Sequence, residues 1–238
     1  LARNIGYVPR SRSAAKANIN FTYNTTSTAS TATLSAGLVC VGTVENTNYL
    51  FSIPNDITTT IVNGVATFNN IDIFQGTFLR KQFVVDGSLD QRFLLDNSFI
   101  DSSTIVVKVA DLNDSGFGRE YSLASNILNI DSTSETYLIQ EVKDERYELL
   151  FGDGYFGKKL SNGDKVTATY IITDGKDGNG PSSFSYAGRV VDDLGNPIVP
   201  TTDISINTNI SAQNGGDIES IDSIKYFAPR IYSSQYRA

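Results

Sequence analysis

Residues 165–172 read KVTATYII, a run in which apolar and polar side chains alternate. Every second side chain of a β-strand lies on the same face of the sheet, so this alternation predicts a strand with one buried face. The same period recurs in INFTYN at 19–24, YLFSI at 49–53 and STIVVKVA at 103–110. The sequence therefore predicts a mainly β fold made of antiparallel, β-sandwich-like domains.

Turn residues stand between these alternating segments. Asn-Gly pairs lie between apolar or charged neighbours in VNGVA at 62–66 and SNGDK at 161–165, and such pairs favour tight hairpins because both residues tolerate positive φ. DDLGNPIV at 192–199 predicts another hairpin tip. The Thr- and Ser-rich residues 24–37 keep β propensity and predict a polar edge strand, with a mobile loop as the alternative.

Short helices are expected at the two ends of the chain. Leu1 and Ile5 have the spacing of a last helical turn that Gly6 and Pro9 would stop. Near the other end, GGDIESIDSIKYFAPR at 215–230 places three isoleucines on one helical face before a proline. Asp217 is the residue that we expect to cap this helix.

Clusters of Gly, Asp and Ser near residues 20, 113 and 185 divide the chain into four expected regions. Residues 1–20 would end a helical N-terminal region and form a linker, and residues 21–112 would form a first β domain. Residues 113–185 would form a second β region, and residues 186–238 a hairpin and a short helix leading to a further C-terminal region. A chain that starts at Leu1 and contains no methionine is expected to be part of a longer polypeptide.

Composition argues against two classes of partner. The 19 basic and 26 acidic residues give a net charge of −7, which disfavours nucleic acid. No apolar run approaches the roughly 20 residues that span a bilayer, so no membrane partner is expected. The single cysteine, Cys40, lies in the apolar run GLVCVG and is expected to be a small buried hydrophobic residue.

Catalysis and metal binding find little support. The chain has no histidine, which excludes nucleophile–histidine pairs, although a glycosidase built on two carboxylates stays an alternative. DLNDSGFG at 111–118 resembles the start of a calcium loop, but Ser122 stands where the bidentate Glu belongs. We therefore favour a turn there, and no catalytic residue, cofactor or metal ligand is predicted.

The segment FGDGYFGKKLSNGDK at 151–165 is interpreted as a set of structural turns. Asp side chains cap nearby backbone groups, and Gly accepts positive φ, so both residue types belong in turns between strands. The GKDGNG segment at 175–180 receives the same interpretation. The residues predicted to shape these turns are Gly152, Asp153, Gly154, Gly157, Gly163, Gly178 and Gly180.

Three separated motifs resemble one known family. YELLFGDGYFGKKLSNGDKVTATYIITDGKDGNG at 147–180 resembles the signature of the baseplate J-like family, the baseplate wedge proteins of contractile-tailed phages. LARNIGYVPRSRSAAKANINF at 1–21 and GGDIESIDSIKYFAPRIYSSQYRA at 215–238 are similar to other segments of that family. The motifs occur in the family's order and cover about a third of the chain.

The resemblance implies a structural protein that links the tail hub to the baseplate periphery and helps to close a ring. The implied partners are other wedge and hub proteins, with self-association within the ring. The implied location is the tail baseplate of the virion, after synthesis in the bacterial cytoplasm. A carbohydrate-binding β-sandwich adhesin is the alternative, and it would need exposed aromatic platforms for sugar rings.

The two chain ends are the expected protein interfaces. The first 16 residues are basic within an acidic chain, and the last residues are rich in Tyr and Arg, which are enriched at interface cores. The predicted interface residues are Arg10, Arg12, Ile221, Ile224, Arg230, Tyr232, Gln235 and Arg237.

Overall fold

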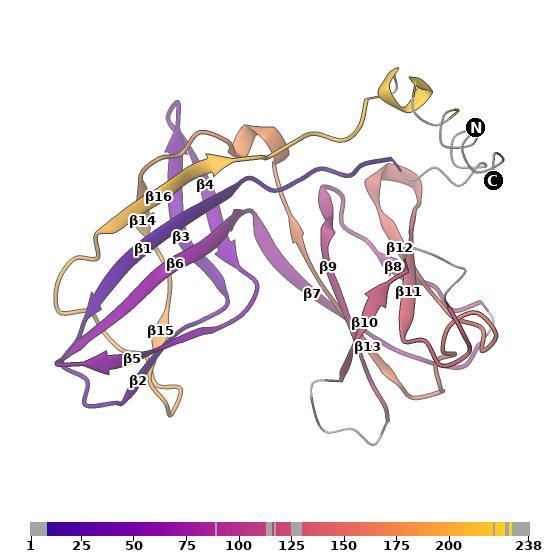
Figure 1. Ribbon diagram of the computed structural model, residues 1–238, viewed down its shortest axis with the longest axis horizontal. Coiled ribbons are helices and arrows are strands. Elements are labelled where there is room, and N and C mark those ends of the chain that lie inside the picture. Colours follow the sequence, from indigo (N-terminus) through magenta and orange to yellow (C-terminus); the bar gives the residue numbers. More distant parts are fainter. Residues whose placement is uncertain are drawn as a thin grey trace. The chain divides into compact units, whose positions relative to one another are not determined.

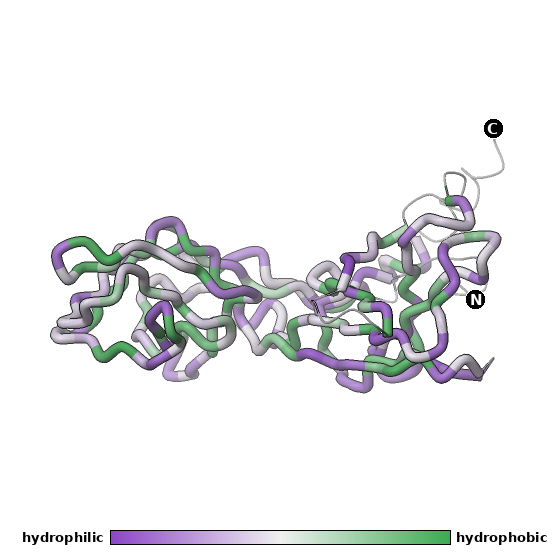
Figure 2. The backbone as a smooth tube through the Cα atoms, turned by 90° about the horizontal axis from the view of Figure 1, so that it is seen from below, coloured by the Kyte–Doolittle hydropathy of each residue, from purple (hydrophilic) through white to green (hydrophobic). Residues whose placement is uncertain are grey.

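The computed structural model describes residues 9–88, 90–112, 116, 118–124, 130–220, 222–226 and 229. Strands dominate these residues (Figure 1), which confirms the predicted mainly β fold. Hydrophobic and hydrophilic positions follow one another at short intervals along the backbone (Figure 2), as the alternation in the sequence requires. The chain forms two compact units, which are described separately.

Unit A comprises residues 12–78 and 171–217. Its strands are β1 (Lys16–Asn24), β2 (Thr31–Leu34), β3 (Gly37–Val44), β4 (Thr47–Ile53), β5 (Ile57–Val62), β6 (Val65–Gln75), β14 (Phe184–Tyr186), β15 (Val190–Val191) and β16 (Ile206–Gln213). They form one sheet in the order β14-β3-β4-β6-β5-β2-β15, and β1 adds to β6 and carries β16. The pairs with a described register are antiparallel.

The core of unit A is aromatic and aliphatic. The ring of Phe21 stacks on that of Phe68 with centroids 4.8 Å apart, and Phe51 meets Phe184 edge-on at 5.0 Å. Ile19, Phe21 and Tyr23 are all buried, as the alternation in INFTYN predicts. Cys40 is fully buried in this core, which confirms its predicted place, and burial raises the pKa of its thiol to about 12.

Unit B comprises the described parts of residues 1–11, 79–170 and 218–238. Its sheet has the order β7-β13-β9-β10-β11-β12-β8. The strands are β7 (Thr77–Val84), β8 (Phe93–Leu95), β9 (Ile100–Ala110), β10 (Arg119–Leu123), β11 (Thr136–Glu141), β12 (Tyr147–Phe151) and β13 (Lys165–Ile172). β10 and β11 pair in parallel, whereas β9–β10, β11–β12 and β12–β8 are antiparallel. Val166, Ala168 and Tyr170 of β13 are buried, as predicted, but at the end of the strand Ile171 is fully buried and Ile172, expected on the same face as the other three, is only partly buried.

Two of the three predicted hairpins are present. Asn63 and Gly64 have φ of 52° and 78° and join β5 to β6, where Val62 pairs with Val65. In the second hairpin, the Asp192 carboxylate accepts hydrogen bonds from the backbone of Leu194 and Asn196. The hairpin predicted at SNGDK is wrong, because the turn at Gly163 hydrogen-bonds to Val85 after β7 and β12 does not pair with β13.

The structure differs from the predicted edge strand and the predicted helix cap, and it does not describe the predicted N-terminal helical turn. β2 is paired on both sides, by β5 and β15, so residues 24–37 do not supply an edge strand. The described helical residues near the C-terminus are 222–226 and 229, and the Ser220 hydroxyl accepts a hydrogen bond from the Ser223 backbone N–H, as an N-cap residue does. Asp217 is therefore not the cap. The helical turn expected at Leu1–Ile5 lies outside the described residues.

Strand pairing crosses the boundaries expected from sequence. The expected regions run consecutively, whereas each unit collects segments from distant parts of the chain. β1 pairs with β16 in unit A, and β9 pairs with β10 across the boundary expected near residue 113. Local Gly and Asp clusters mark turns, but they do not reveal which strands pair across long distances. Two short 3₁₀ helices, η3 (Lys143–Glu145) and η4 (Gly175–Gly178), also occur.

Candidate interaction surfaces

Two segments from opposite parts of the sequence, at Arg10 and at Glu219, meet in unit B. The backbone N–H of Arg10 donates to the Glu219 carboxylate at 3.1 Å, and the Glu219 N–H donates to the Arg10 carbonyl at 3.0 Å. Glu219 is buried, and the Ser223 hydroxyl donates to its other oxygen at 2.6 Å. These contacts hold the start of the chain beside the short C-terminal helix, and Arg10 itself is exposed.

In unit A the same two segments continue side by side. Ser13 and Gly216 exchange backbone hydrogen bonds of 2.9 and 3.0 Å. The Asp217 carboxylate lies 2.7 Å from the Lys176 ammonium and 3.9 Å from the Arg12 guanidinium. The hydrogen bond from Lys176 and the charges of Lys176 and Arg12 lower the pKa of Asp217. Arg12 thus belongs to a cluster of three charged side chains within unit A, together with Lys176 and Asp217.

The predicted interface residues are only partly described. Arg10 is exposed, Arg12 faces Asp217, and Ile224 is partly exposed on the short helix. Of the others, Ile221, Arg230, Tyr232, Gln235 and Arg237 lie outside the described residues.

A hydrogen-bonded loop, residues 152–157, follows β12. The Asp153 carboxylate accepts hydrogen bonds from the backbone N–H groups of Phe156 at 2.9 Å and Tyr155 at 2.8 Å, and these bonds lower its pKa. Gly154 has φ of 98° and Gly157 has φ of 86°, a region that favours glycine. Gly152 has no positive φ, but a Cβ atom there would lie 2.2 Å from the Gly157 carbonyl carbon.

Residues 131–135 anchor this loop to the rest of unit B. The backbone N–H of Gly157 donates to the Asp131 carbonyl at 3.0 Å, and that of Lys158 donates to Ser134 at 2.8 Å. The Lys158 ammonium also lies 3.0 Å from the Glu135 carboxylate. The loop presents Tyr155 and Phe156 to solvent, with exposed fractions of 82% and 65%. Neither aromatic residue was predicted as a site, although both lie in a Gly-Asp turn outside any strand alternation.

The other three predicted turn glycines, Gly163, Gly178 and Gly180, are required for two different reasons, backbone conformation and close packing. Gly163 and Gly180 have φ of 91° and 109°. Gly178 instead allows close packing, because a Cβ atom there would lie 2.6 Å from the side chain of Gln75. The Gln75 amide is fixed by Thr173 and Asp174, whose hydroxyl and N–H donate to its oxygen.

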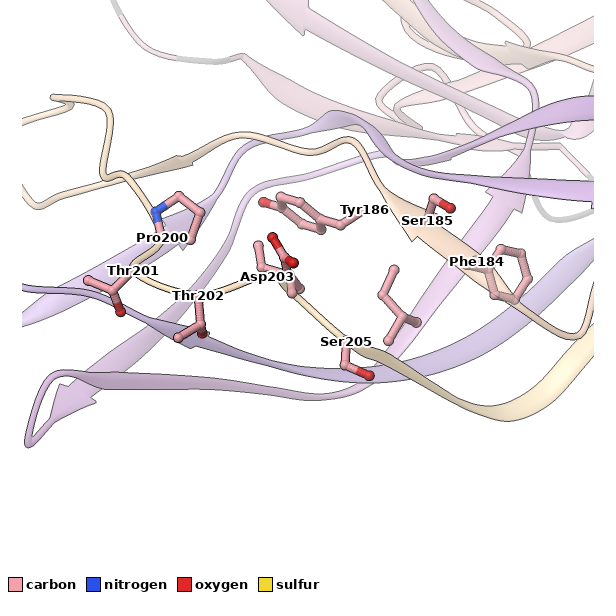
Figure 3. Close-up of a pocket in the computed structure, with 10 residues that line it drawn as sticks. Phe184, Ser185, Tyr186, Pro200, Thr201, Thr202, Asp203 and Ser205 are labelled. Carbon is pink, nitrogen blue, oxygen red and sulfur yellow. The ribbon is translucent and has the colours of Figure 1, made fainter.

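A cavity of about 710 Å³ opens in unit A between β14 and residues 200–206 (Figure 3). Phe184 and Tyr186 line one side, and Pro200, Asp203 and Ser205 lie on the other. Hydroxyl groups of Ser and Thr and one carboxylate make the lining mostly polar.

Tyr186 is the unusual residue of this cavity. Its ring packs against Phe21 at 5.3 Å and Tyr23 at 6.2 Å. The Tyr186 hydroxyl is buried, yet no described residue forms a hydrogen bond with it. Burial raises the pKa of this hydroxyl. The neighbouring Tyr23 hydroxyl, in contrast, donates to the Ile198 carbonyl at 2.6 Å.

The described residues offer binding groups rather than a metal centre. No group of three or more His, Cys, Asp or Glu side chains that could hold a metal ion occurs among them. In the calcium-like segment, Asp111 pairs with Arg119 at 3.2 Å, and residues 113–115 lie outside the described part. No helix in the described part is long and apolar enough to cross a membrane.

A relationship to a known protein extends over nearly the whole sequence. Comparison with models of protein families gives no match. The chain is 26% identical over 249 aligned positions to the baseplate wedge protein gp6 of Enterobacteria phage T4. The chain is thus similar to a baseplate wedge protein. The similarity covers 94% of this chain and 36% of gp6, so the chain spans about a third of the length of this relative.

Proposed function

We propose that this chain is a structural part of the baseplate wedge of a phage contractile tail, where it connects subunits in the ring around the tail hub. The similarity to gp6 over 94% of the chain carries this proposal. It extends through both β units, so it is not confined to one short turn motif.

We propose that the chain acts by binding and not by catalysis. The sequence has no histidine, and the described side chains include no cluster suited to a metal. The hydrogen-bonded loop at residues 152–157 and the pairing of strands far apart in the sequence suit a part with a binding role.

The partners that we propose are other wedge and hub proteins, together with further copies of the same protein in the ring. The exposed Arg10 beside the C-terminal helix supports a contact at the chain ends, because a basic group on an acidic chain suits an acidic neighbour. The protein would be made in the cytoplasm of the bacterial host and would end in the virion, in the tail baseplate.

A complementation experiment tests this function. A phage that lacks the gene for the complete protein would be supplied with the complete protein or with a version in which this segment is replaced by a flexible linker. We expect normal tails only with the complete protein, as seen by electron microscopy and plaque counts. Normal contractile tails with the replaced version would overturn the proposal. Binding of the purified chain to host glycans would favour the adhesin instead.

A further inference from the structure

The sheet of unit A is almost a closed ring of strands. One path of pairing runs from β14 through β3, β4, β6 and β1 to β16, and β5, β2 and β15 branch from it at β6. Two hydrogen bonds close the ring near β14: Gly180 N–H donates to the Ala212 carbonyl at 2.8 Å, and Ala212 N–H donates to the Pro181 carbonyl at 2.9 Å. Beyond this contact the two ends separate, and the cavity of Figure 3 lies between them.

The cavity between residues 184–186 and 200–206 is called the slot. One wall of the slot is the free edge of β14. The Ala187 N–H donates to Val39 on β3, so the alternation of an antiparallel ladder directs the peptide groups of Ser185 toward β3 as well. The N–H and C=O groups of Phe184 and Tyr186 then point away from β3. In the described part of the chain, β14 has no second neighbouring strand, and these groups have no hydrogen-bond partner.

The other wall is also unpaired. Thr201 N–H bonds to Asn24, and β16 begins at Ile206, opposite Phe21. Between them, the backbone of Asp203 and Ile204 forms no hydrogen bond with any described residue. The Asp203 carboxylate is exposed and has no ion pair within the described part. The slot therefore has unpaired backbone groups on both sides and one negative charge on its rim.

The Tyr186 hydroxyl adds a third unpaired group. A buried hydroxyl without a partner costs free energy, so such groups usually have one. The ring of Tyr186 lines the cavity, whereas its hydroxyl lies below the surface, close to Gly188.

We propose that this slot binds an extended segment of another protein, which adds a strand to the edge of β14 and places a Lys or Arg side chain at Asp203. An extended chain supplies the donors and acceptors that would pair with the free edge of β14 and with the backbone of Asp203 and Ile204. We expect a Lys or Arg in the partner segment because the exposed Asp203 carboxylate has no ion pair in the described part of the chain, and a positive charge would complement it. The identity of the partner as a baseplate neighbour rests on the proposed function.

Site-specific crosslinking tests the proposal in assembled tails. A benzophenone amino acid would replace Ser205 of the complete protein, and the irradiated tails would be digested and analysed by mass spectrometry. We expect an adduct with one segment of a different baseplate protein, with a Lys or Arg within a few residues of the crosslink. An adduct only with another copy of this protein, or none at all, would overturn the proposal.

Matched substitutions sharpen the result. Asp203→Lys should reduce the adduct at least tenfold, whereas Asp193→Lys makes the same charge change in the neighbouring hairpin and should leave it unchanged. Equal reduction by both Lys variants would contradict a specific role of Asp203. If the protein is absent from purified tails, the proposed function fails; if it is present without an adduct, only the slot proposal fails.

Discussion

Gly152 lies so close to Gly157 that a Cβ atom on Gly152 would overlap the Gly157 carbonyl carbon, at 2.2 Å. We therefore expect Gly152→Val to lower the free energy of unfolding by about 1–3 kcal/mol through overlap with the backbone. Gly154→Val should cost a similar amount, about 1–3 kcal/mol, for a different reason, since φ at Gly154 is 98°. Denaturant titrations measure both values. Unchanged stability in both variants would show that loop 152–157 tolerates side chains.

The Asp153 carboxylate makes the order of the same loop dependent on pH. Hydrogen bonds from the backbone of Phe156 and Tyr155 lower its pKa in the folded state. A group with a lowered pKa stabilises the fold above its ordinary value of about 3.9 and loses this contribution as the pH falls through the folded value. The protection factors of the Tyr155 and Phe156 amides, measured by NMR and corrected for the intrinsic pH dependence of exchange, should therefore fall as the pH drops through the folded pKa of Asp153.

Asp153→Ala should have the same effect at neutral pH. We expect exchange of the two amides to accelerate on the order of tenfold, because both lose their acceptor. Amides in the β5–β6 hairpin serve as the control and should not change. A variant with unaltered exchange at Tyr155 and Phe156 would mean that the backbone alone keeps this loop in place.

Tyr23 and Tyr186 should respond in opposite ways to loss of the hydroxyl. Tyr23→Phe breaks the hydrogen bond to the buried Ile198 carbonyl and should cost about 1 kcal/mol. Tyr186→Phe removes a buried hydroxyl without a described partner and should stabilise the isolated chain by about 1 kcal/mol. Thermal or urea unfolding of the two variants tests this. Equal destabilisation would indicate that the Tyr186 hydroxyl is satisfied in solution.

Charge reversal at the chain start separates interface effects from folding effects. Arg10→Glu changes an exposed side chain, so stability should stay within about 0.5 kcal/mol while tail assembly is impaired. Arg12→Glu is a poorer test, because it places a second carboxylate near Asp217. Full assembly with Arg10→Glu would remove Arg10 from the proposed interface.

Chelator treatment should leave the melting temperature of the chain unchanged. The described residues contain no metal-type cluster, and Asp111 is engaged with Arg119. A metal that binds only the folded state would raise stability by mass action, and its removal would lower the melting temperature. A drop of several degrees on adding EDTA, reversed by excess calcium, would point to the segment 111–118.

Local features of the sequence predict local structure well. The period of two identified the buried faces of β1 and β13, and the Asn-Gly pair identified the β5–β6 hairpin, because both signals depend on neighbouring residues alone. SNGDK contains the same pair but forms a turn between strands that do not pair, since partner choice depends on the whole sheet.

The candidate sites depend on long-range pairing and could not be derived in the same way. The slot beside Tyr186 exists because β14 and β16 close the ring only at Gly180 and Ala212, a relationship that no local pattern encodes. Tyr155 and Phe156 were visible in the sequence as aromatic residues within a turn. Their exposure follows from the way Asp153 and Gly157 fold the loop.

The pairing of β1 with β16 also sets the timing of folding during synthesis. Asn20 and Asn209, 189 positions apart, are hydrogen-bonded across these strands, and Arg10 meets Glu219 across 209 positions. At ordinary translation rates a ribosome needs roughly 10–40 s to supply the second strand after the first. During that time β1 can pair with β6 but presents its other edge, which makes the nascent chain a substrate for chaperones and for mispairing with its neighbours on a polysome.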